Sequence, residues 1–235
     1  MAELILALDV PRRGDALRLL DLIPELRWVK LGSILMTREG PGLIREVAAR
    51  GLQVFLDLKW HDIPNTVAGA VTAARELGVA MATVHALGGR AMLEAAAIAA
   101  GGELALVGVT VLTSHDSSSY GGAIGRTQVD LRHEVERQAL VAAEAGLQGV
   151  VCSPQEVSLL RRRLGPALYL IVPGIRRRTD PTGDQARVAT AKDAVSNGAT
   201  HLVVGRPVLQ AADPGAVFGE FLKEARCIGS SSPAS

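Results

Sequence analysis

The chain has 235 residues, and its 25 basic and 24 acidic side chains leave a formal net charge of +1 at pH 7. Hydrophobic residues make up 48% of the composition, which excludes an intrinsically disordered chain. The balanced charge argues against a nucleic-acid-binding surface, which needs a basic face. The sequence contains no run of about 20 apolar residues, so we expect no transmembrane helix.

The N-terminal residues 1–9 indicate a strand rather than a signal peptide, because no basic leader is present and Glu3 interrupts the apolar run early. The two cysteines, Cys152 and Cys227, form neither a CxxC pair nor a cluster with metal-ligand spacing. We therefore expect a cytoplasmic protein with reduced thiols and no metal site built on cysteine.

Short apolar runs alternate with longer segments of helical periodicity along the chain. The runs are continuous rather than alternating, as expected for strands whose two faces are both buried in a parallel sheet. We expect eight strands, at residues 4–9, 28–32, 53–58, 79–85, 104–112, 147–152, 168–173 and 201–205. Eight β-then-α units predict an α/β fold, a single-domain (β/α)8 TIM barrel over residues 1–228, with a doubly wound open sheet as the alternative. Residues 229–235 are Ser-rich and are expected to form a disordered tail.

The segments between the strands support this pattern. Gly51, Gly78, Gly146 and Gly198 each end a helical segment just before a strand, where a left-handed backbone is favoured. Pro207 is expected in the first turn of the last helix. Two polar stretches, residues 114–125 and 176–185, predict loops beside the barrel mouth, and the second is expected to close over a phosphate.

Functional residues of such barrels gather at the carboxyl ends of the strands. In this sequence, ionisable and polar side chains recur at the carboxyl ends of the predicted strands. Charges scattered over a surface would not show this regular placement. The residues at these ends are Asp9, Lys30, Asp57, Lys59, His85, Thr113, Arg176 and Arg206. We therefore interpret this end of the barrel as the candidate active-site face.

The densest cluster follows the third strand. Asp57 and Lys59 are two residues apart, so a regular strand points them to the same side. Burying such charges is costly unless they are paired. With Lys30 and Asp62, two lysines and two aspartates can alternate and stay ionised, and a lysine held charged there can act as a general acid. A purely structural salt bridge at the strand end is the alternative.

A second cluster predicts an anion site. Residues 172–176 and 203–207 end the seventh and eighth strands, whose loops frequently bind phosphate in these barrels. Gly205 permits a close approach of the backbone, and Arg206 supplies a bidentate charged donor. The alternative is a solvated surface loop. For His85 a catalytic and a packing role both stay open, whereas His61 is expected to orient its loop.

The chain resembles the orotidine 5′-phosphate decarboxylases from residue 7 to residue 207. Its most specific segment is residues 57–66, Asp-Leu-Lys-Trp-His-Asp-Ile-Pro-Asn-Thr, and Val111-Leu-Thr-Ser, Pro173-Gly-Ile-Arg and Gly205-Arg-Pro follow in the family's order. The resemblance implies a cofactor-free decarboxylation of orotidine 5′-phosphate to UMP and CO2 in pyrimidine biosynthesis, with no metal. It also implies that Lys59 donates the proton to C6 of the pyrimidine.

The resemblance assigns roles to individual residues of this sequence. The charged network would be Lys30, Asp57, Lys59 and Asp62, with Asp62 supplied by the other subunit of a homodimer. The residues expected to bind substrate are Asp9, Lys30, Asp57 and Thr66 near the ribose and carboxylate, Thr113 near the pyrimidine, and Arg176, Gln185, Gly205 and Arg206 at the phosphate.

Two other functions stay open. A Mg²⁺-dependent phosphosugar decarboxylase or aldolase of the same superfamily resembles the chain around Asp57, Lys59 and Asp62, but such enzymes carry an acidic residue where Lys30 stands. Lys30 would repel the metal ion. The second alternative is a non-catalytic nucleotide-binding barrel, since a fold does not determine a function.

Overall fold

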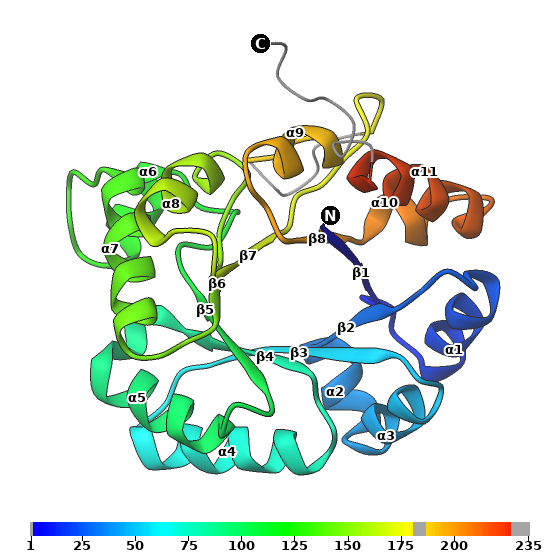
Figure 1. Ribbon diagram of the computed structural model, residues 1–235, viewed down its shortest axis with the longest axis horizontal. Helices are drawn as coiled ribbons and strands as arrows, with labels where there is room; N and C mark the ends of the chain where they lie inside the picture. Colours follow the sequence, from blue (N-terminus) through cyan, green and yellow to red (C-terminus); the bar gives the residue numbers. More distant parts are fainter. Residues whose placement is uncertain (1, 181–186, 227–235) are drawn as a thin grey trace.

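The computed structural model describes residues 2–180 and 187–226, and its strands close into one barrel (Figure 1). Each strand pairs in parallel with the next along the chain, and β1 closes the barrel by pairing with β8 through Glu3–His201 and the three following residue pairs. The strands are β1 (Glu3–Ala7), β2 (Trp28–Gly32), β3 (Gln53–Trp60), β4 (Met81–His85), β5 (Ala105–Val109), β6 (Gly149–Val151), β7 (Tyr169–Val172) and β8 (His201–Val204). The predicted TIM barrel is confirmed, and the open-sheet alternative is wrong.

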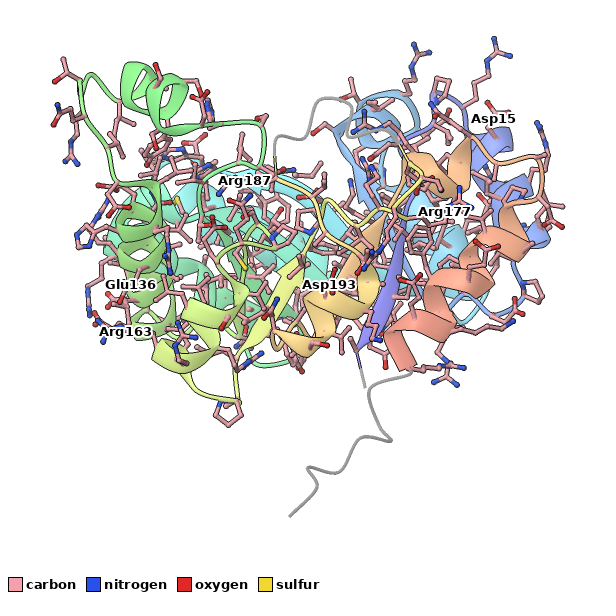
Figure 2. The ribbon with its side chains drawn as sticks, turned by 90° about the horizontal axis from the view of Figure 1, so that it is seen from above. Asp15, Glu136, Arg163, Arg177, Arg187 and Asp193 are labelled. Carbon is pink, nitrogen blue, oxygen red and sulfur yellow. The ribbon has the colours of Figure 1, made fainter. Side chains whose placement is uncertain are left out.

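Helices surround the barrel on its outer side (Figure 1). They are α1 (Arg13–Leu22), α2 (Ser33–Glu39), α3 (Gly42–Ala49), α4 (Pro64–Glu76), the 3-10 turn η1 (Ala86–Gly88), α5 (Gly89–Ala100), α6 (Ser117–Ala123), α7 (Leu131–Glu144), α8 (Val157–Leu164), α9 (Ala191–Ser196), α10 (Arg206–Leu209) and α11 (Pro214–Arg226). Ion pairs join neighbouring helices on the surface, such as Arg163 of α8 with Glu136 of α7 (Figure 2).

The expected glycine positions are confirmed by the backbone. Gly51, Gly78, Gly146 and Gly198 all have positive φ angles, between 78° and 105°. Each of them turns the chain from the end of a helix toward the next strand, in a conformation that a side chain would strain.

Three details of the sequence prediction are wrong. The fifth strand ends at Val109 rather than at residue 112, because residues 110–112 leave the sheet to form part of the barrel mouth. Residues 114–125 are not all loop, since Asp116 and Ser119 form a capping box that starts α6. Pro207 lies in the first turn of α10, but α11 follows, so α10 is not the last helix.

The period of two along each strand divides the buried residues into two clusters. Leu4, Leu6 and Leu8 pack outward against the helices, whereas Ile5 and Ala7 lie inside the barrel. The inner cluster is completed by Phe55, Met81, Val107, Ile171 and Val203. On five of the strands, the residue two positions further along reaches the barrel mouth at its carboxyl end; these residues are Asp9, Asp57, Val109, Pro173 and Gly205.

Candidate active site

A cavity of about 470 Å³ opens at the carboxyl end of the barrel. Its floor is apolar and includes Ala7, Phe55, Ile171 and Val203 of the inner cluster. The predicted site residues that line it are Asp9, Lys30, Asp57, Lys59, Thr113, Arg176, Gly205 and Arg206. The structure thus brings together eight of the predicted residues, from the ends of β1, β2, β3, β5, β7 and β8.

Four charged side chains form a continuous array on one side of this cavity. Lys30 Nζ lies 3.0 Å from Asp9 Oδ1 and 3.3 Å from Asp57 Oδ2. Lys59 Nζ lies 2.9 Å from Asp57 Oδ1. We call Asp9, Lys30, Asp57 and Lys59 the charged array. Acids and bases alternate along it, but the second acid within this chain is Asp9 rather than Asp62.

The array keeps its two buried members ionised. Burial alone lowers the pKa of Lys30, but the Asp57 and Asp9 carboxylates outweigh it and raise that pKa above its ordinary value. Burial alone raises the pKa of Asp57, but Lys30, Lys59 and the Thr83 hydroxyl hold it below its ordinary value. An ammonium and a carboxylate are therefore both present in the cavity at neutral pH.

Thr83 supports the array from below and was not predicted from the sequence. Its Oγ1 donates a hydrogen bond to Asp57 Oδ1 at 3.0 Å and accepts one from the backbone N–H of Lys59 at 2.8 Å. The residue is fully buried and lies on β4, next to β3 in the barrel. The signal that could have found it is a lone hydroxyl in the strand Met-Ala-Thr-Val-His.

The backbone at Lys59 explains why a hydrogen bond is needed there. Lys59 has φ 52°, the one positive φ outside glycine among the residues described, and the β3–β4 register shifts between Leu56 and Trp60. The prediction that regular strand alternation brings Asp57 and Lys59 together is therefore wrong. The two side chains meet across an irregular strand end. Thr83 holds this sparsely populated conformation in place.

Asp62 and Thr66 lie outside the cavity of their own chain. Both are exposed, and Asp62 Oδ1 accepts a hydrogen bond from the Ile63 backbone N–H at 2.7 Å. Ile63 itself is 67% exposed, which is unusual for a large apolar side chain. Within one chain, the structure does not bring these residues to the charged array.

The two histidines near the array pack on each other. The rings of His61 and His85 are stacked with centroids 5.5 Å apart, and His85 Nδ1 accepts a hydrogen bond from the Leu87 backbone at the start of η1. Burial, together with the neighbouring His61 and Lys59, lowers the pKa of His85. These contacts favour a structural role for both histidines.

The opposite side of the cavity carries the predicted anion-binding residues. Gly174, Arg176, Gly205 and Arg206 line it, and Arg176 and Arg206 also line a neighbouring hollow of about 260 Å³. Arg177 instead forms ion pairs with Asp180 and Glu220. Residues 181–185, which are half of the predicted closing loop and include Gln185, lie outside the described residues.

One of the two cysteines, Cys152, lies within the described residues and is buried. Burial raises the pKa of Cys152 at the cavity floor, which keeps it a thiol, and Cys227 lies outside the described residues. Over residues 2–180 and 187–226, no group of three or more His, Cys, Asp or Glu side chains could hold a metal ion. The same ranges contain no helix long and apolar enough to cross a membrane.

Known proteins resemble this chain in sequence and in fold. The sequence model described as the orotidine 5′-phosphate decarboxylase / HUMPS family matches residues 2–221. The orotidine 5′-phosphate decarboxylase of Halorhodospira halophila is 48% identical over 233 residues, 97% of each chain, and that of Moorella thermoacetica is 45% identical over 90% of this chain and 87% of its own. The crystal structure of the orotidine 5′-phosphate decarboxylase from Lactobacillus acidophilus superposes with a TM-score of 0.86 at 33% identity, over 96% of this chain and 100% of that one.

Proposed function

The chain belongs to the orotidine 5′-phosphate decarboxylase / HUMPS family, and on this premise we propose that its charged array decarboxylates orotidine 5′-phosphate to UMP, with Lys59 as proton donor. The observation that carries the proposal is the alternation Asp9–Lys30–Asp57–Lys59 at the cavity wall. Lys30 bridges the two carboxylates that a divalent cation would otherwise use, which supports a metal-free reaction over the Mg²⁺-dependent alternative.

The proposed chemistry follows from where charge develops. When the bond from C6 to the carboxylate breaks, CO2 leaves and the electron pair stays on C6 in the plane of the ring, where the π system cannot delocalise it. A preorganised cation beside C6 stabilises that charge. Lys59, held by Asp57 at 2.9 Å, supplies the cation and then transfers a proton to C6. Asp57, close to the departing carboxylate, also favours its loss by repulsion.

The remaining cavity residues bind the rest of the substrate. Asp9 and Lys30 are proposed to contact the ribose, and Thr113 lies on the rim where a pyrimidine would be bound. Arg176, Arg206 and the Gly205 backbone are proposed to hold the phosphate, together with Gln185. Because phosphate and reacting carbon lie at opposite ends of the ligand, phosphate binding can supply energy that positions the ring on the charged array.

We propose that the site is completed by a second copy of this chain. Asp57 is the one carboxylate within 4.0 Å of Lys59 Nζ among the described residues, and the Lys59 side chain is 38% exposed. Asp62 and Thr66 are exposed and do not line the cavity of their own chain, and Ile63 between them is exposed as well. In a homodimer, Asp62 of one subunit would flank Lys59 of the other and Thr66 would contact the ribose.

The test is the ultraviolet absorbance of orotidine 5′-phosphate incubated with purified protein and EDTA. Loss of the orotate absorbance with formation of UMP supports the proposal and the absence of a metal requirement together. Turnover of a sugar phosphate only after Mg²⁺ is restored would replace it by the phosphosugar alternative. UMP binding with no release of CO2 would leave a non-catalytic nucleotide-binding barrel.

A further inference from the structure

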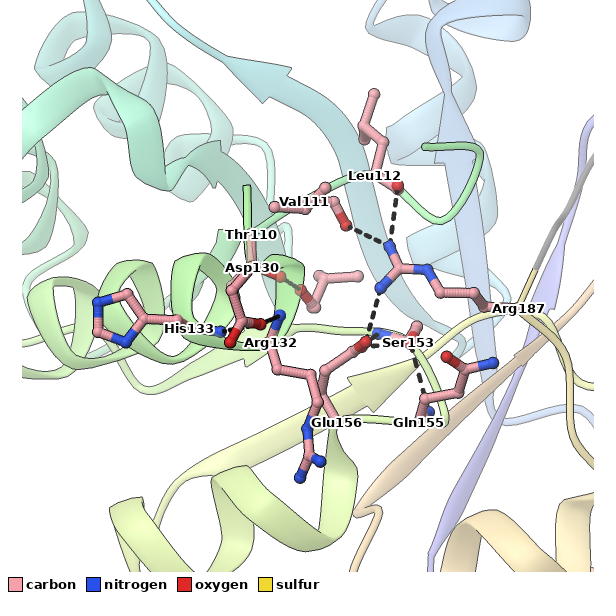
Figure 3. A network of polar contacts seen from close by, with 11 residues as sticks. Thr110, Val111, Leu112, Asp130, Arg132, His133, Ser153, Gln155, Glu156 and Arg187 are labelled. Atoms are coloured by element: carbon pink, nitrogen blue, oxygen red, sulfur yellow. Dashed lines mark hydrogen bonds and ion pairs between the residues drawn. The ribbon is translucent and has the colours of Figure 1, made fainter. Parts of the chain in front are cut away.

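A buried ion pair lies directly behind the cavity wall, on the side opposite the charged array. Arg187 Nη1 lies 2.6 Å from Glu156 Oε1, and their side chains are only 7% and 2% exposed. Neither residue lines the cavity. Figure 3 shows the pair between the loops that follow β5 and β6.

The other end of the guanidinium holds the loop after β5. Arg187 Nη2 donates to the backbone carbonyls of Val111 at 3.3 Å and Leu112 at 3.0 Å (Figure 3). Val111, Leu112 and the following Thr113 all line the cavity. The Arg187 side chain is therefore hydrogen-bonded to the segment that carries Thr113, the proposed pyrimidine contact.

Glu156 connects the same guanidinium to the loop after β6. Its carboxylate accepts hydrogen bonds from the backbone N–H of Ser153 at 3.0 Å and from the Ser153 hydroxyl. Ser153 follows Cys152, which lines the cavity. Because both carboxylate oxygens of Glu156 have partners, this side chain offers Arg187 a fixed partner.

The segment that carries Arg187 is itself joined to the loop after β7. Ala189 pairs with Ile175 in a parallel bridge, with Arg176 N–H donating to Ala189 O at 2.9 Å and Ala189 N–H to Gly174 O at 3.2 Å. Gly174 and Arg176 line the proposed phosphate side of the cavity. Arg187 thus links three consecutive βα loops that together form one wall.

We propose that Arg187 is a positioning residue for substrate binding, and that with Glu156 it sets the spacing between the pyrimidine and phosphate contacts of this wall. Burial of an ion pair is poor evidence for a role in stability, because desolvation of both charges offsets much of their attraction. The planar fork of arginine is instead suited to this geometry, since it reaches a carboxylate and two carbonyls at once and a lysine ammonium cannot.

This role rests on the proposed function, and it predicts different effects on KM and on kcat. The charged array comes from β1, β2 and β3, on the other side of the mouth, and shares no hydrogen bond with Arg187. Loss of Arg187 should therefore weaken binding of substrate and product alike while the reacting groups stay in place. Such uniform loss raises KM and leaves kcat nearly unchanged.

The experiment compares Arg187→Met and Arg187→Lys with the unchanged chain, using turnover of orotidine 5′-phosphate and calorimetric affinity for UMP. In Arg187→Met, KM and the UMP Kd are expected to rise together by at least about tenfold, with kcat within about threefold. Arg187→Lys keeps the charge opposite Glu156 but not the fork, so it is expected to lie between the two.

Arg161→Lys is the matched control. Arg161 of α8 donates to the carbonyls of Leu168 and Gly198, which precede β7 and β8 at the opposite end of the barrel. It is expected to lower the unfolding temperature with KM and the UMP Kd unchanged.

KM and UMP Kd within about twofold of the unchanged chain in folded Arg187→Met, or in folded Arg187→Lys where the first does not fold, would overturn the proposal. So would failure of both variants to fold, because the pair would then serve the fold alone. Absence of turnover in the unchanged chain would refute the proposed function instead. The UMP affinities of the variants would still test whether Arg187 positions the binding wall.

Discussion

Replacing Thr83 by valine is the most informative single change for the charged array. Valine has nearly the same shape as threonine but cannot hydrogen-bond, so the packing of β4 is kept. The change removes the acceptor of the Lys59 backbone N–H at 2.8 Å and the donor to Asp57 Oδ1 at 3.0 Å. Lys59 then loses the hydrogen bond that holds its left-handed backbone.

The magnitude follows from these two contacts. A hydrogen bond to a charged group contributes about 1.5–3 kcal/mol, and an unpaired buried N–H costs about 1–3 kcal/mol. If displacement of the Lys59 ammonium costs the transition state the energy of one such contact, kcat falls by about 10–150-fold. KM should change little, because the proposed phosphate and pyrimidine contacts lie on other strands.

The pH profile gives a second readout with a defined sign. Burial raises the pKa of Asp57, and Lys30, Lys59 and Thr83 together hold it below its ordinary value. Without the Thr83 hydroxyl, that pKa moves up, so the acidic limb of kcat moves to higher pH. Steady-state kinetics from about pH 2.5 to 6 would follow the shift, because the pKa of Asp57 starts below the value near 3.9 of a free aspartate.

Thr83→Ser is the matched control, because it keeps the hydroxyl and loses only a methyl group. It is expected to retain both hydrogen bonds and most of the turnover. Equal kcat and equal pH profiles in the valine and serine variants would refute the idea that Thr83 positions Lys59.

Other predictions concern the proton donor, the dimer, the phosphate and the barrel floor. Lys59→Ala should abolish turnover while calorimetric UMP affinity largely survives, and wild-type turnover would exclude its proposed role. Mixing inactive Lys59→Ala with inactive Asp62→Ala should restore part of the activity; no recovery despite demonstrated subunit exchange would contradict a shared site. Arg206→Ala should lower kcat as well as raise KM in steady-state assays, and a change in KM alone would limit Arg206 to ground-state binding. Burial lowers the pKa of His201 to about 4, so the unfolded chain binds a proton that the folded one excludes, and stability should fall by about 3 kcal/mol from about pH 6.5 to 4. Urea unfolding of His201→Phe should lack most of this pH dependence, and an unchanged slope would assign it to other groups.

The barrel and the face that carries the cavity were predictable because both depend on periodicity. A strand period of two and helical segments that end at glycine are local signals, and they place Asp9, Lys30 and Asp57 at strand ends without any knowledge of the third dimension. Closure of the sheet then brings these ends to one rim. The pairing of Asp57 with Lys59 was also predicted, but from regular strand alternation, whereas the structure forms it across an irregular strand end.

The supporting contacts were not predictable in the same way, because they join residues far apart in the sequence through geometry that no period contains. Thr83 reaches Lys59 only because β3 departs from regular geometry at its end. Arg187 reaches carbonyls 75 and 76 residues earlier in the chain. Asp9 was expected at the ribose, and its ion pair with Lys30 depends on the exact lengths of β1 and β2.

These two sets of contacts divide the barrel mouth into parts with different tasks. The charged array and Thr83 belong to β1, β2, β3 and β4, and their contacts end at Lys59. The wall held by Arg187 belongs to the loops after β5, β6 and β7. If each part is rigid by itself, Thr83 variants should lower kcat and Arg187 variants should raise KM. The fall in kcat/KM of the double variant should then be the product of the two single falls. A double variant that departs from this product would mean that the substrate couples the two parts, since no hydrogen bond or ion pair among the described residues joins Arg187 to the array.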